Sequence, residues 1–304
     1  MKKKIIIAGA TGLIGNKLVP KLIERNYEVI VLARNLEKAK SLFGHNAIIF
    51  KMNELSHNSL EQFENAFAFI NLSGEGIAAK RWTDKQKEKI LSSRVNSTRY
   101  LFSIANKLKN KPVKFLSASA VGYYGNSTDE IFTETSPAGG NFLAEVTKKW
   151  EDEVIKFSSL GIEESRIRLA VVLDKTDGAL SKMLIPFKLF IGGPLGSGEQ
   201  WFPWIHIYDA VEIFMFALEN KISGPINAAA PCLINMNEFA QALGAILNRP
   251  TFFRVPEFVL NAVLGEASEM ILEGAKVIPE ILVQTGYNFK FPKVEEALKD
   301  LLIK

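Results

Sequence analysis

The sequence predicts an α/β protein with a Rossmann-type, doubly wound parallel sheet and a smaller C-terminal substrate lobe. Short apolar runs alternate with segments of helical periodicity through the first half of the chain. The first apolar run leads into a turn whose glycines are spaced three apart, and a helical pattern follows. Runs that are apolar throughout are typical of parallel strands buried on both faces. Strict succession of strand and helix is typical of a doubly wound sheet.

The expected strands are the apolar runs at 4–8, 28–33, 47–51, 66–72, 113–119 and 166–173. A further strand is expected at 226–229. The clearest helix begins at Thr83, because Thr83 and Gln86 form a capping-box pattern ahead of a long apolar periodicity. Helical patterns also cover 208–219 and 235–247.

The organisation of the chain changes after Leu173, where the regular pattern loosens into Gly- and aromatic-rich segments. We expect residues 1–250 to form the Rossmann domain, with the irregular insertion 174–207 contributing to the substrate lobe. The tail, 251–304, is rich in Phe, Leu and Val. It is expected to form a small lobe over the carboxyl ends of the strands, where open α/β sheets bind ligands.

Composition narrows the class of protein and its partners. The chain has 304 residues, a hydrophobic fraction of 47% and a net charge of +4, which suits a soluble globular protein with a substantial core. Lys and Arg are spread along the chain, so neither nucleic acid nor a membrane surface is an expected partner. We expect a small-molecule substrate, and a homodimer is left open.

Cysteine and histidine give no sign of a disulfide or a metal site. The single cysteine, Cys232, fits a reducing compartment and is expected to be a small buried apolar residue. The three histidines, His45, His57 and His206, are scattered, and Cys232 has no partner at ligand spacing. We therefore expect no metal.

The first motif with chemical meaning is "IIIAGATGLIG", a glycine-rich turn between a strand and a helix. Glycines at this place allow a tight turn, let backbone N–H groups approach a pyrophosphate, and let the helix pack closely on the strand. An ordinary Gly-rich turn is the alternative, but the position directly after the first strand favours a dinucleotide site. The expected contacts in this loop are Gly9, Thr11, Gly12, Leu13, Ile14 and Gly15.

The end of the second strand, "VIVLARN", indicates which dinucleotide binds. An acidic residue there would bind the ribose 2′-hydroxyl of NAD, whereas Arg34 occupies the place in this chain. A guanidinium suits a 2′-phosphate through charge-assisted bonds, although Arg34 could also be a solvated loop residue. The sequence therefore favours NADP(H) as the cofactor.

These residues resemble the extended short-chain dehydrogenase/reductase superfamily, in its epimerase/dehydratase branch. The chain is most similar to the bacterial group labelled "epimerase family protein". The resemblance covers nearly the whole chain, through "GATGLIG", "NLSGEGIAAKRWT", "SRVNST", "SASAVGYYG", "FLAEVTKKWE", "GGPLGSGEQWFPWIHIYD" and "GYNFKFP". It implies a Rossmann-type domain, an NADP cofactor and a cytoplasmic setting, and it specifies no substrate.

The resemblance assigns roles to two strand ends. Ser119 matches the family's catalytic serine at the end of the fifth strand, where its hydroxyl would be the best-placed hydrogen-bond donor to a substrate oxygen. A strand-end hydroxyl that caps a turn is the alternative. The segment after the fourth strand, which would border the adenosine side of the cofactor, is Asn71, Leu72, Ser73 and Gly74.

The chain departs from the family at the proton donor. Family members carry Tyr-x-x-x-Lys on the helix after Ser119, and the Lys and the cofactor ribose lower the pKa of the Tyr. Here Phe142 or Leu143 stands in place of the Tyr, and Val146 or Thr147 in place of the Lys. No alignment restores the pair.

Other proton donors are conceivable near Ser119. Tyr123 and Tyr124 follow it closely, but without a cationic partner each stays protonated near neutral pH, so they are expected to line or pack the pocket. His206 titrates near neutrality, with a structural role beside aromatic residues as the alternative. Arg94 stands where relatives usually have Asn, and it points either to the cofactor or substrate, or to a salt-bridge partner on another helix.

The sequence therefore predicts an NADP(H)-dependent oxidoreductase or epimerase-like enzyme that acts on a small polar substrate without the usual Tyr-Lys pair. The alternative is a noncatalytic NADP(H)-binding sensor or scaffold. Loss of the pair favours the sensor, whereas the elaborate loop 192–209 favours the enzyme, because a sensor has less need of a lined pocket. Ser119 is the first catalytic candidate, ahead of Tyr124 and His206.

Overall fold

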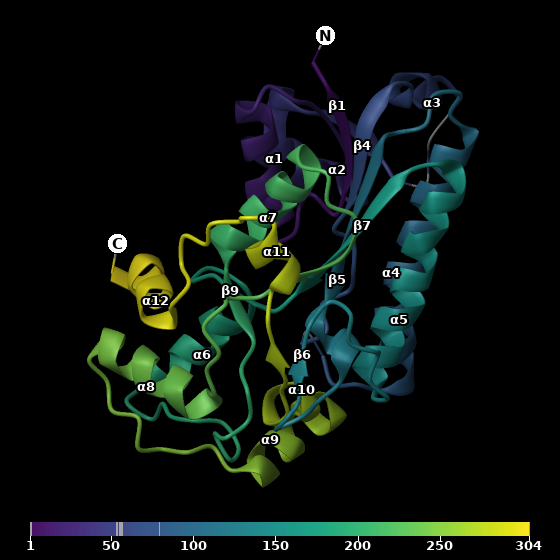
Figure 1. The fold of residues 1–304 in the computed structure, drawn as a ribbon. Helices are drawn as coiled ribbons and strands as arrows, with labels where there is room; N and C mark the ends of the chain where they lie inside the picture. Colours follow the sequence, from purple (N-terminus) through teal and green to yellow (C-terminus); the bar gives the residue numbers. More distant parts are fainter. Residues whose placement is uncertain (1, 53, 55–56, 79, 304) are drawn as a thin grey trace.

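The computed structural model describes residues 2–52, 54, 57–78 and 80–303, and its centre is a seven-stranded parallel sheet (Figure 1). Its strands are β1 (Lys4–Ala8), β2 (Glu28–Ala33), β3 (Ile48–Lys51), β4 (Ala66–Asn71), β5 (Lys114–Ala120), β7 (Glu163–Leu169) and β10 (Gly224–Ala228). The order across the sheet is β10-β7-β5-β4-β1-β2-β3, with every pair parallel. The predicted doubly wound α/β fold is confirmed. The strand order reverses between β1 and β4, where such sheets bind ligands.

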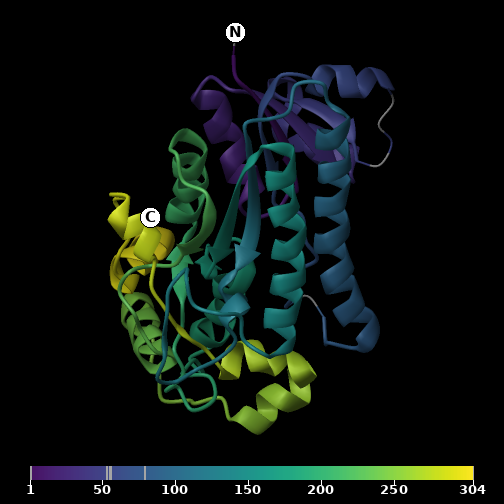
Figure 2. The same ribbon diagram turned by 45° about the vertical axis from the view of Figure 1, so that its right-hand side comes forward.

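Helices cover both faces of the sheet, so apolar side chains of the strands are buried on both sides. The α-helices are α1 (Gly15–Glu24), α2 (Leu36–Phe43), α3 (His57–Phe63), α4 (Asp84–Lys107), α5 (Phe142–Ile155), α6 (Gly178–Lys188), α7 (Ile207–Glu219), α8 (Met236–Leu247), α9 (Glu257–Leu264), α10 (Glu269–Leu272), α11 (Glu280–Gln284) and α12 (Val294–Ile303). α1 and α7 pack together on one face, and α4 and α5 on the other (Figure 1, Figure 2). In β1, Ile5, Ile6 and Ile7 are fully buried.

The long helix α4 begins where the sequence predicts. Thr83 is its N-cap, and the Thr83 hydroxyl accepts a hydrogen bond from the N–H of Gln86 at 3.3 Å. An N-cap of this kind satisfies one of the first backbone donors of a helix, which have no partner within the helix itself. The cap therefore fixes the start of α4, the helix that packs against α5 on one face of the sheet.

The predicted strand at 166–173 is two strands in the structure. β7 ends at Leu169, and the chain then leaves the central sheet as β8 (Val171–Leu173), which pairs with β9 (Trp204–His206). The N–H of Ala170 still donates to the carbonyl of Ala228 at 3.0 Å, whereas the N–H of Val171 donates to Pro203. The sequence shows a single apolar run here, because composition does not reveal that its first part pairs within the central sheet and its second part pairs with β9.

The segment from 251 onward shares the core of the rest of the chain. β11 (Lys276–Val277) pairs with β6 (Ile131–Phe132), and α12 packs against α8. Phe291 and Leu298 belong to the same buried apolar cluster as the strands of the central sheet. α9 and α10 lie at the lower end of the molecule in Figure 1.

Asp209, in the first turn of α7, fastens the C-terminal segment. Its buried carboxylate accepts from the hydroxyl of Tyr287 at 3.1 Å and from the N–H groups of Lys290 at 2.9 Å and Phe291 at 3.0 Å. Three donors satisfy a buried carboxylate that would otherwise be costly to desolvate. These hydrogen bonds fix the position of the segment that leads into α12.

Two further observations concern the surface. Cys232 is exposed, which corrects the expectation of a buried apolar residue. It lies in the loop after β10, where the chain turns toward α8 and leaves the core. No helix in the described ranges is long and apolar enough to cross a membrane.

Candidate functional site

The three glycines after β1 meet three different steric demands. Gly9 has φ of +79°, and a Cβ there would lie 2.4 Å from the carbonyl carbon of Leu72. A Cβ on Gly15 would lie 2.5 Å from the Cα of Ala10. A Cβ on Gly12 would meet only the carbonyl oxygen of Gly9, at 3.4 Å, and Gly12 lines a cleft of about 510 Å³. Gly9 and Gly15 therefore permit the turn and the close packing, while Gly12 keeps the cleft open.

The loop presents unsatisfied backbone donors at the start of α1. Thr11 lines the cleft. The N–H groups of Leu13 and Ile14 have no acceptor in the described part of the chain, and the side chains of both residues pack against the core. Free N–H groups at a helix N-terminus attract an anion, because the helix dipole places partial positive charge there. The loop can therefore hold a pyrophosphate.

The far end of the cleft is basic. Arg34 follows β2, Lys38 lies one turn into α2, and both side chains are exposed and line the cleft. No described carboxylate lies within ion-pair distance of either cation. Asn35 caps α2, with its Oδ1 accepting from the N–H of Lys38 at 3.0 Å. Two unpaired cations beside a helix N-terminus can bind a phosphate group.

The segment after β4 forms the opposite wall of the cleft. Leu72, Ser73 and Gly74 line it, as the resemblance implies. Asn71 does not, because its side chain is fully buried and turns inward. Its Nδ2 donates to the hydroxyl of Thr98 at 3.0 Å, and its Oδ1 accepts from the N–H of Ser73 at 3.0 Å. Asn71 therefore shapes the turn that places Ser73 and Gly74.

Arg94 lies behind that wall. Its Nη1 donates to the carbonyls of Glu75 at 3.0 Å and Ile90 at 2.9 Å, and its guanidinium lies 5.3 Å from the ring of Trp150. A Cβ on Gly74 would approach the guanidinium carbon to 3.2 Å. Burial lowers the pKa of Arg94 to about 10. No described carboxylate lies within ion-pair distance of Arg94, which supports the backbone under the cleft, and its contact with a ligand stays a prediction.

Ser119 is the last serine of β5, and its hydroxyl is committed to a buried carboxylate. Its Oγ donates to Oε1 of Glu151, on α5, at 2.6 Å. Glu151 in turn accepts from Nε and Nη2 of Arg168, on β7, both at 2.8 Å. All three residues are 2–3% exposed. Because a carboxylate only accepts, Ser119 presents lone pairs to the site rather than the proton expected from the sequence.

Tyr124 extends this network and is held in its neutral form. Its hydroxyl accepts from Nη1 of Arg168 at 2.8 Å and donates to Oδ1 of Asn227, on β10, at 2.6 Å. Its ring stacks on Phe132, with centroids 5.2 Å apart. Burial raises the pKa of Tyr124 to about 12. The hydroxyl is therefore a structural link between β7 and β10. Arg168 is a cationic partner that the sequence did not lead us to expect, yet the tyrosine stays protonated and packed.

Tyr123 and α5 complete the surroundings of Ser119. The guanidinium of Arg168 lies 3.6 Å from the centroid of the Tyr123 ring. On α5, Leu143 faces Gly122, and the hydroxyl of Thr147 donates to the carbonyl of Leu143 at 2.7 Å. The charged groups near Ser119 thus come from positions 151, 166 and 168, not from the helix positions that carry Tyr and Lys in relatives.

A second cavity, which we name the lobe cavity, has a volume of about 610 Å³. It is bounded by the loop after Tyr124, by the turn before α5, and by the segments 197–201 and 272–274. Tyr124 lines it and also contacts Arg168. The lobe cavity therefore adjoins the network that contains Ser119.

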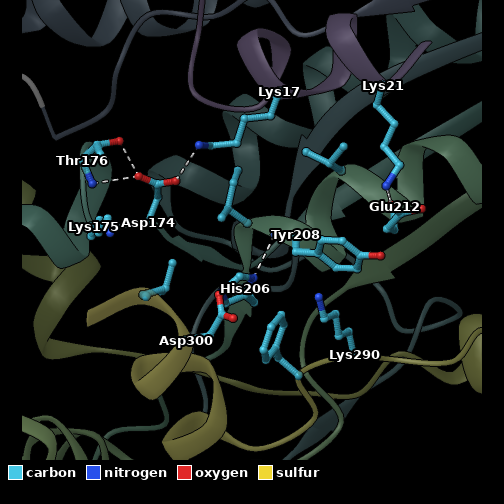
Figure 3. A pocket seen from close by; sticks show the side chains of 14 residues that line it. Lys17, Lys21, Asp174, Lys175, Thr176, His206, Tyr208, Glu212, Lys290 and Asp300 are labelled. Atoms are coloured by element: carbon cyan, nitrogen blue, oxygen red, sulfur yellow. Dashed lines mark hydrogen bonds and ion pairs between the residues drawn. The ribbon is translucent and has the colours of Figure 1, made fainter. Parts of the chain in front are cut away.

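His206 lies apart from that network. Its Nδ1 caps α7 by accepting from the N–H of Tyr208 at 2.9 Å, and its ring packs on Phe291 with centroids 3.9 Å apart. Its Nε2 lies 3.6 Å from Oδ2 of Asp300. It lines a cavity between α1, α7 and the C-terminal segment (Figure 3), which Ser119 does not line. The contacts give His206 a structural role.

The charges around that third cavity are largely compensated. Lys17 pairs with Asp174 at 3.1 Å, and Lys21 pairs with Glu212 (Figure 3). The ammonium of Lys290 lies over the ring of Tyr208. Because these partners are internal, the cavity is a weaker candidate than the glycine-lined cleft.

Sequence reasoning missed Lys38, Glu151, Arg168 and Asn227. Lys38 had a readable signal, because it lies four residues after Arg34 at the start of a helix. Glu151 and Arg168 had none, since buried acids and bases look like surface charges in a sequence. Their role becomes visible only in the folded chain, where α5 packs against β7 and brings the two side chains together.

Comparison with known proteins places the chain in a family. The model of the NAD dependent epimerase/dehydratase family matches residues 5–143, and a domain of unknown function matches 255–301. The Arabidopsis thaliana "Epimerase family protein SDR39U1 homolog, chloroplastic" is 38% identical over 98% of this chain and 86% of the relative. The chain is a member of the epimerase family proteins. The resemblance stated from the sequence is confirmed.

Other epimerase family proteins agree over the whole length. The Bacillus subtilis epimerase family protein YfhF is 35% identical over 98% of this chain and 97% of the relative. The human epimerase family protein SDR39U1, crystallised with NADPH, is 33% identical, has a TM-score of 0.88, and is matched over 99% of both chains. A Corynebacterium glutamicum protein named nucleoside-diphosphate sugar epimerase is 29% identical, with a TM-score of 0.79 over 99% of this chain and 58% of that one.

Proposed function

We propose that this epimerase family protein is an NADP(H)-dependent oxidoreductase or epimerase-like enzyme that acts on a small polar substrate. The observation that carries the proposal is the alignment of three features along neighbouring strand ends. Arg34 follows β2, the glycine loop follows β1, and Ser119 ends β5, with β4 between β1 and β5. The human relative crystallised with NADPH supports the same cofactor class.

The described residues fit NADP(H) along the whole cleft. Gly12 leaves space where a side chain would intrude, and the N–H groups of Leu13 and Ile14 suit the pyrophosphate. Arg34 and Lys38 would bind the 2′-phosphate through charge-assisted hydrogen bonds. Leu72, Ser73 and Gly74 would border the adenosine side.

When bound, the nicotinamide supplies hydride exchange with a carbon of the substrate. The protein's part is to orient the substrate oxygen and manage its proton. Ser119 is suited to accept a hydrogen bond from a substrate hydroxyl, because its own proton points to Glu151. That proton can pass to Glu151 as the substrate proton passes to Ser119.

Glu151 and Arg168 replace the Tyr-Lys pair in this proposal. Arg168 holds the carboxylate of Glu151 in place through two hydrogen bonds of 2.8 Å each. General acid-base catalysis is worth about 10² to 10⁴ in rate, and the usual Tyr-Lys pair that supplies it is missing from this chain. We therefore expect slow conversion by the standards of the superfamily.

The test is a screen of polyols, sugars and carbonyl compounds with NADP⁺ or NADPH, followed on the absorbance of the reduced cofactor. Ser119→Ala should reduce turnover by about 10² or more while NADPH affinity is unchanged. Ser117→Ala is the matched control, because the Ser117 hydroxyl on the same strand donates to the carbonyl of Ala118. It should retain turnover.

Two outcomes would contradict the enzyme proposal. If a broad screen gives no turnover while NADPH binds, the noncatalytic sensor is favoured. If Ser119→Ala turns over at the unmodified rate, the role of Ser119 is wrong.

We also propose a cytoplasmic site of action, since the single exposed cysteine, Cys232, suits a reducing compartment.

A further inference from the structure

Two walls of the lobe cavity belong to segments of the chain that also carry the proposed catalytic centre. Its first wall, Tyr124 to Thr128, starts five residues after Ser119 in the chain. Its second wall ends at Asn141, the N-cap of α5, whose Oδ1 accepts from the N–H of Ala144 at 2.9 Å. α5 is the helix that carries Glu151. Tyr124, which lines the cavity and accepts a hydrogen bond from Arg168, links the cavity to that centre.

Its walls are joined by three hydrogen bonds, two of them partly buried. The Nε2 of Gln200 donates to the carbonyls of Leu195 at 2.9 Å and Ile271 at 2.8 Å. The indole N–H of Trp201 donates to the carbonyl of Thr128 at 2.9 Å. These bonds tie three separate segments together, so the shape of the cavity exists before any ligand arrives.

The charge of the lining is negative. Glu199 and Glu273 line the cavity, and no Lys or Arg is among the described residues that do. Oε1 of Glu199 accepts from Nδ2 of Asn237 at 2.9 Å, and Oε2 of Glu273 accepts from Nδ2 of Asn126. Neither carboxylate lies within ion-pair distance of a described cation. The partner of Glu273 is a neutral amide, whereas the amide that binds Glu199 also accepts from Nη2 of Arg254 at 3.1 Å, so Glu273 is the less compensated of the two carboxylates.

The surroundings of Glu273 strengthen this field. Burial raises the pKa of Glu273, and the nearby carboxylate of Glu269 raises it further. The like charge of Glu269 adds to the negative potential beside Glu273 and so favours a positive charge in the cavity. Lys276 does not line the cavity: its ammonium lies 4.8 Å from the centroid of the Trp201 ring and donates to the carbonyl of Asp129 at 3.4 Å.

We propose that the lobe cavity is the substrate compartment and that it takes a hydroxylated amine rather than a phosphorylated sugar. The inference rests on the proposed function, and it narrows the small polar substrate to one class. Hydroxyl and amide groups of Asn126, Ser127 and Ser197 suit a polyhydroxylated molecule. Glu199 and Glu273 suit its ammonium group, and they repel a diphosphate of the kind in nucleotide sugars.

The experiment uses the full chain saturated with NADPH and three probes that differ in charge. Glucosamine carries an ammonium below neutral pH, N-acetylglucosamine is neutral, and UDP-N-acetylglucosamine is anionic. Titration followed by ligand-observed NMR should rank them in that order of affinity. We expect glucosamine to bind about tenfold more tightly than the neutral sugar, as one charge-assisted bond implies.

Glu273→Gln should weaken glucosamine about tenfold and leave N-acetylglucosamine unchanged. Glu130→Gln is the matched control, because Glu130 is exposed on the same loop region and does not line the cavity. It should change neither affinity. Both side chains lie near the surface, so the two variants are expected to fold.

Each remaining outcome decides against the inference. No measurable glucosamine binding, equal binding of the UDP sugar, or an equal loss in Glu130→Gln would overturn it. Failure of the proposed function is seen separately, as loss of NADPH binding or as undiminished turnover in Ser119→Ala. A protein that binds NADPH and prefers the UDP sugar refutes only the substrate class.

Discussion

The cofactor cleft and the network around Ser119 lie at neighbouring strand ends, yet they are built in opposite ways. In the cleft, Arg34 and Lys38 are exposed and have no described carboxylate partner. In the network, Ser119, Glu151 and Arg168 are buried and satisfy one another. The cleft needs a ligand to complete its hydrogen bonds, whereas the network is complete without one. Substitutions in the two regions should therefore have different effects, on binding in one and on stability in the other.

The largest effect is expected from Arg168→Met. It leaves the carboxylate of Glu151 buried without its bidentate partner, which should cost about 3–5 kcal/mol of the free energy of unfolding. Urea denaturation measures the loss. Arg25→Met is the control, since Arg25 is exposed and its pair with Glu219, at 3.4 Å, should be worth under about 1 kcal/mol.

A double variant sharpens this prediction. Replacing Glu151 and Arg168 together with Met removes both charges, so it should be less destabilising than Arg168→Met alone. If the double variant is as unstable as the sum of the two single variants, the charges do not interact. The comparison between a complete network and an incomplete cleft would then lose its basis.

A smaller effect is expected from Tyr124→Phe at alkaline pH. The pKa of Tyr124 is raised to about 12, above the value of about 10 for an unfolded tyrosine. The stabilisation due to its proton is therefore complete below about pH 10 and is lost as the pH rises toward 12. Two units correspond to about 2–3 kcal/mol.

The measurement compares urea unfolding of the two proteins across this pH range. The unmodified protein should lose about 2–3 kcal/mol more than Tyr124→Phe between pH 9 and 12. Parallel pH dependence in the two proteins would show that Tyr124 ionises equally well in the folded and unfolded states. Its place in the network would then be wrong.

The smallest effects on stability and the clearest on binding belong to the cleft. Arg34→Ala should weaken NADPH about tenfold or more and Lys38→Ala about threefold, with NADH little affected by either. Calorimetric titration of both cofactors measures this. Lys40→Ala is the control, because Lys40 lies on the same helix and pairs with Glu37. Equal losses for NADPH and NADH would contradict the 2′-phosphate site.

The two regions also differ in how far the sequence predicts them. The cleft follows from local rules: a glycine spacing after the first strand and Arg34 after the second are each read within a few residues. The network depends on Glu151 and Arg168, which come from a helix and a strand that only the fold brings together. No local pattern separates them from the other charged residues of the chain.

Ser119 shows the same limit within one residue. Its position at a strand end is readable, and the direction of its hydrogen bond is not, because that direction is set by a carboxylate 32 residues later. Likewise the run 166–173 is readable as apolar, but its division between β7 and β8 depends on the partner strand β9. Partners that are distant in the sequence decide both cases.

The parallel pair β6–β11 bears on the order in which the two sites form during synthesis. It joins Ile131 and Phe132 to Lys276 and Val277, and residues of the lobe cavity lie just before both strands. The residues proposed to bind the dinucleotide are all within the first 74 of the chain. Pairing of β6 with β11 closes a long loop of the chain, which is slow. It also comes late, because β11 must first leave the ribosome. The nascent protein therefore holds the parts of its cofactor site long before it has a place for a substrate.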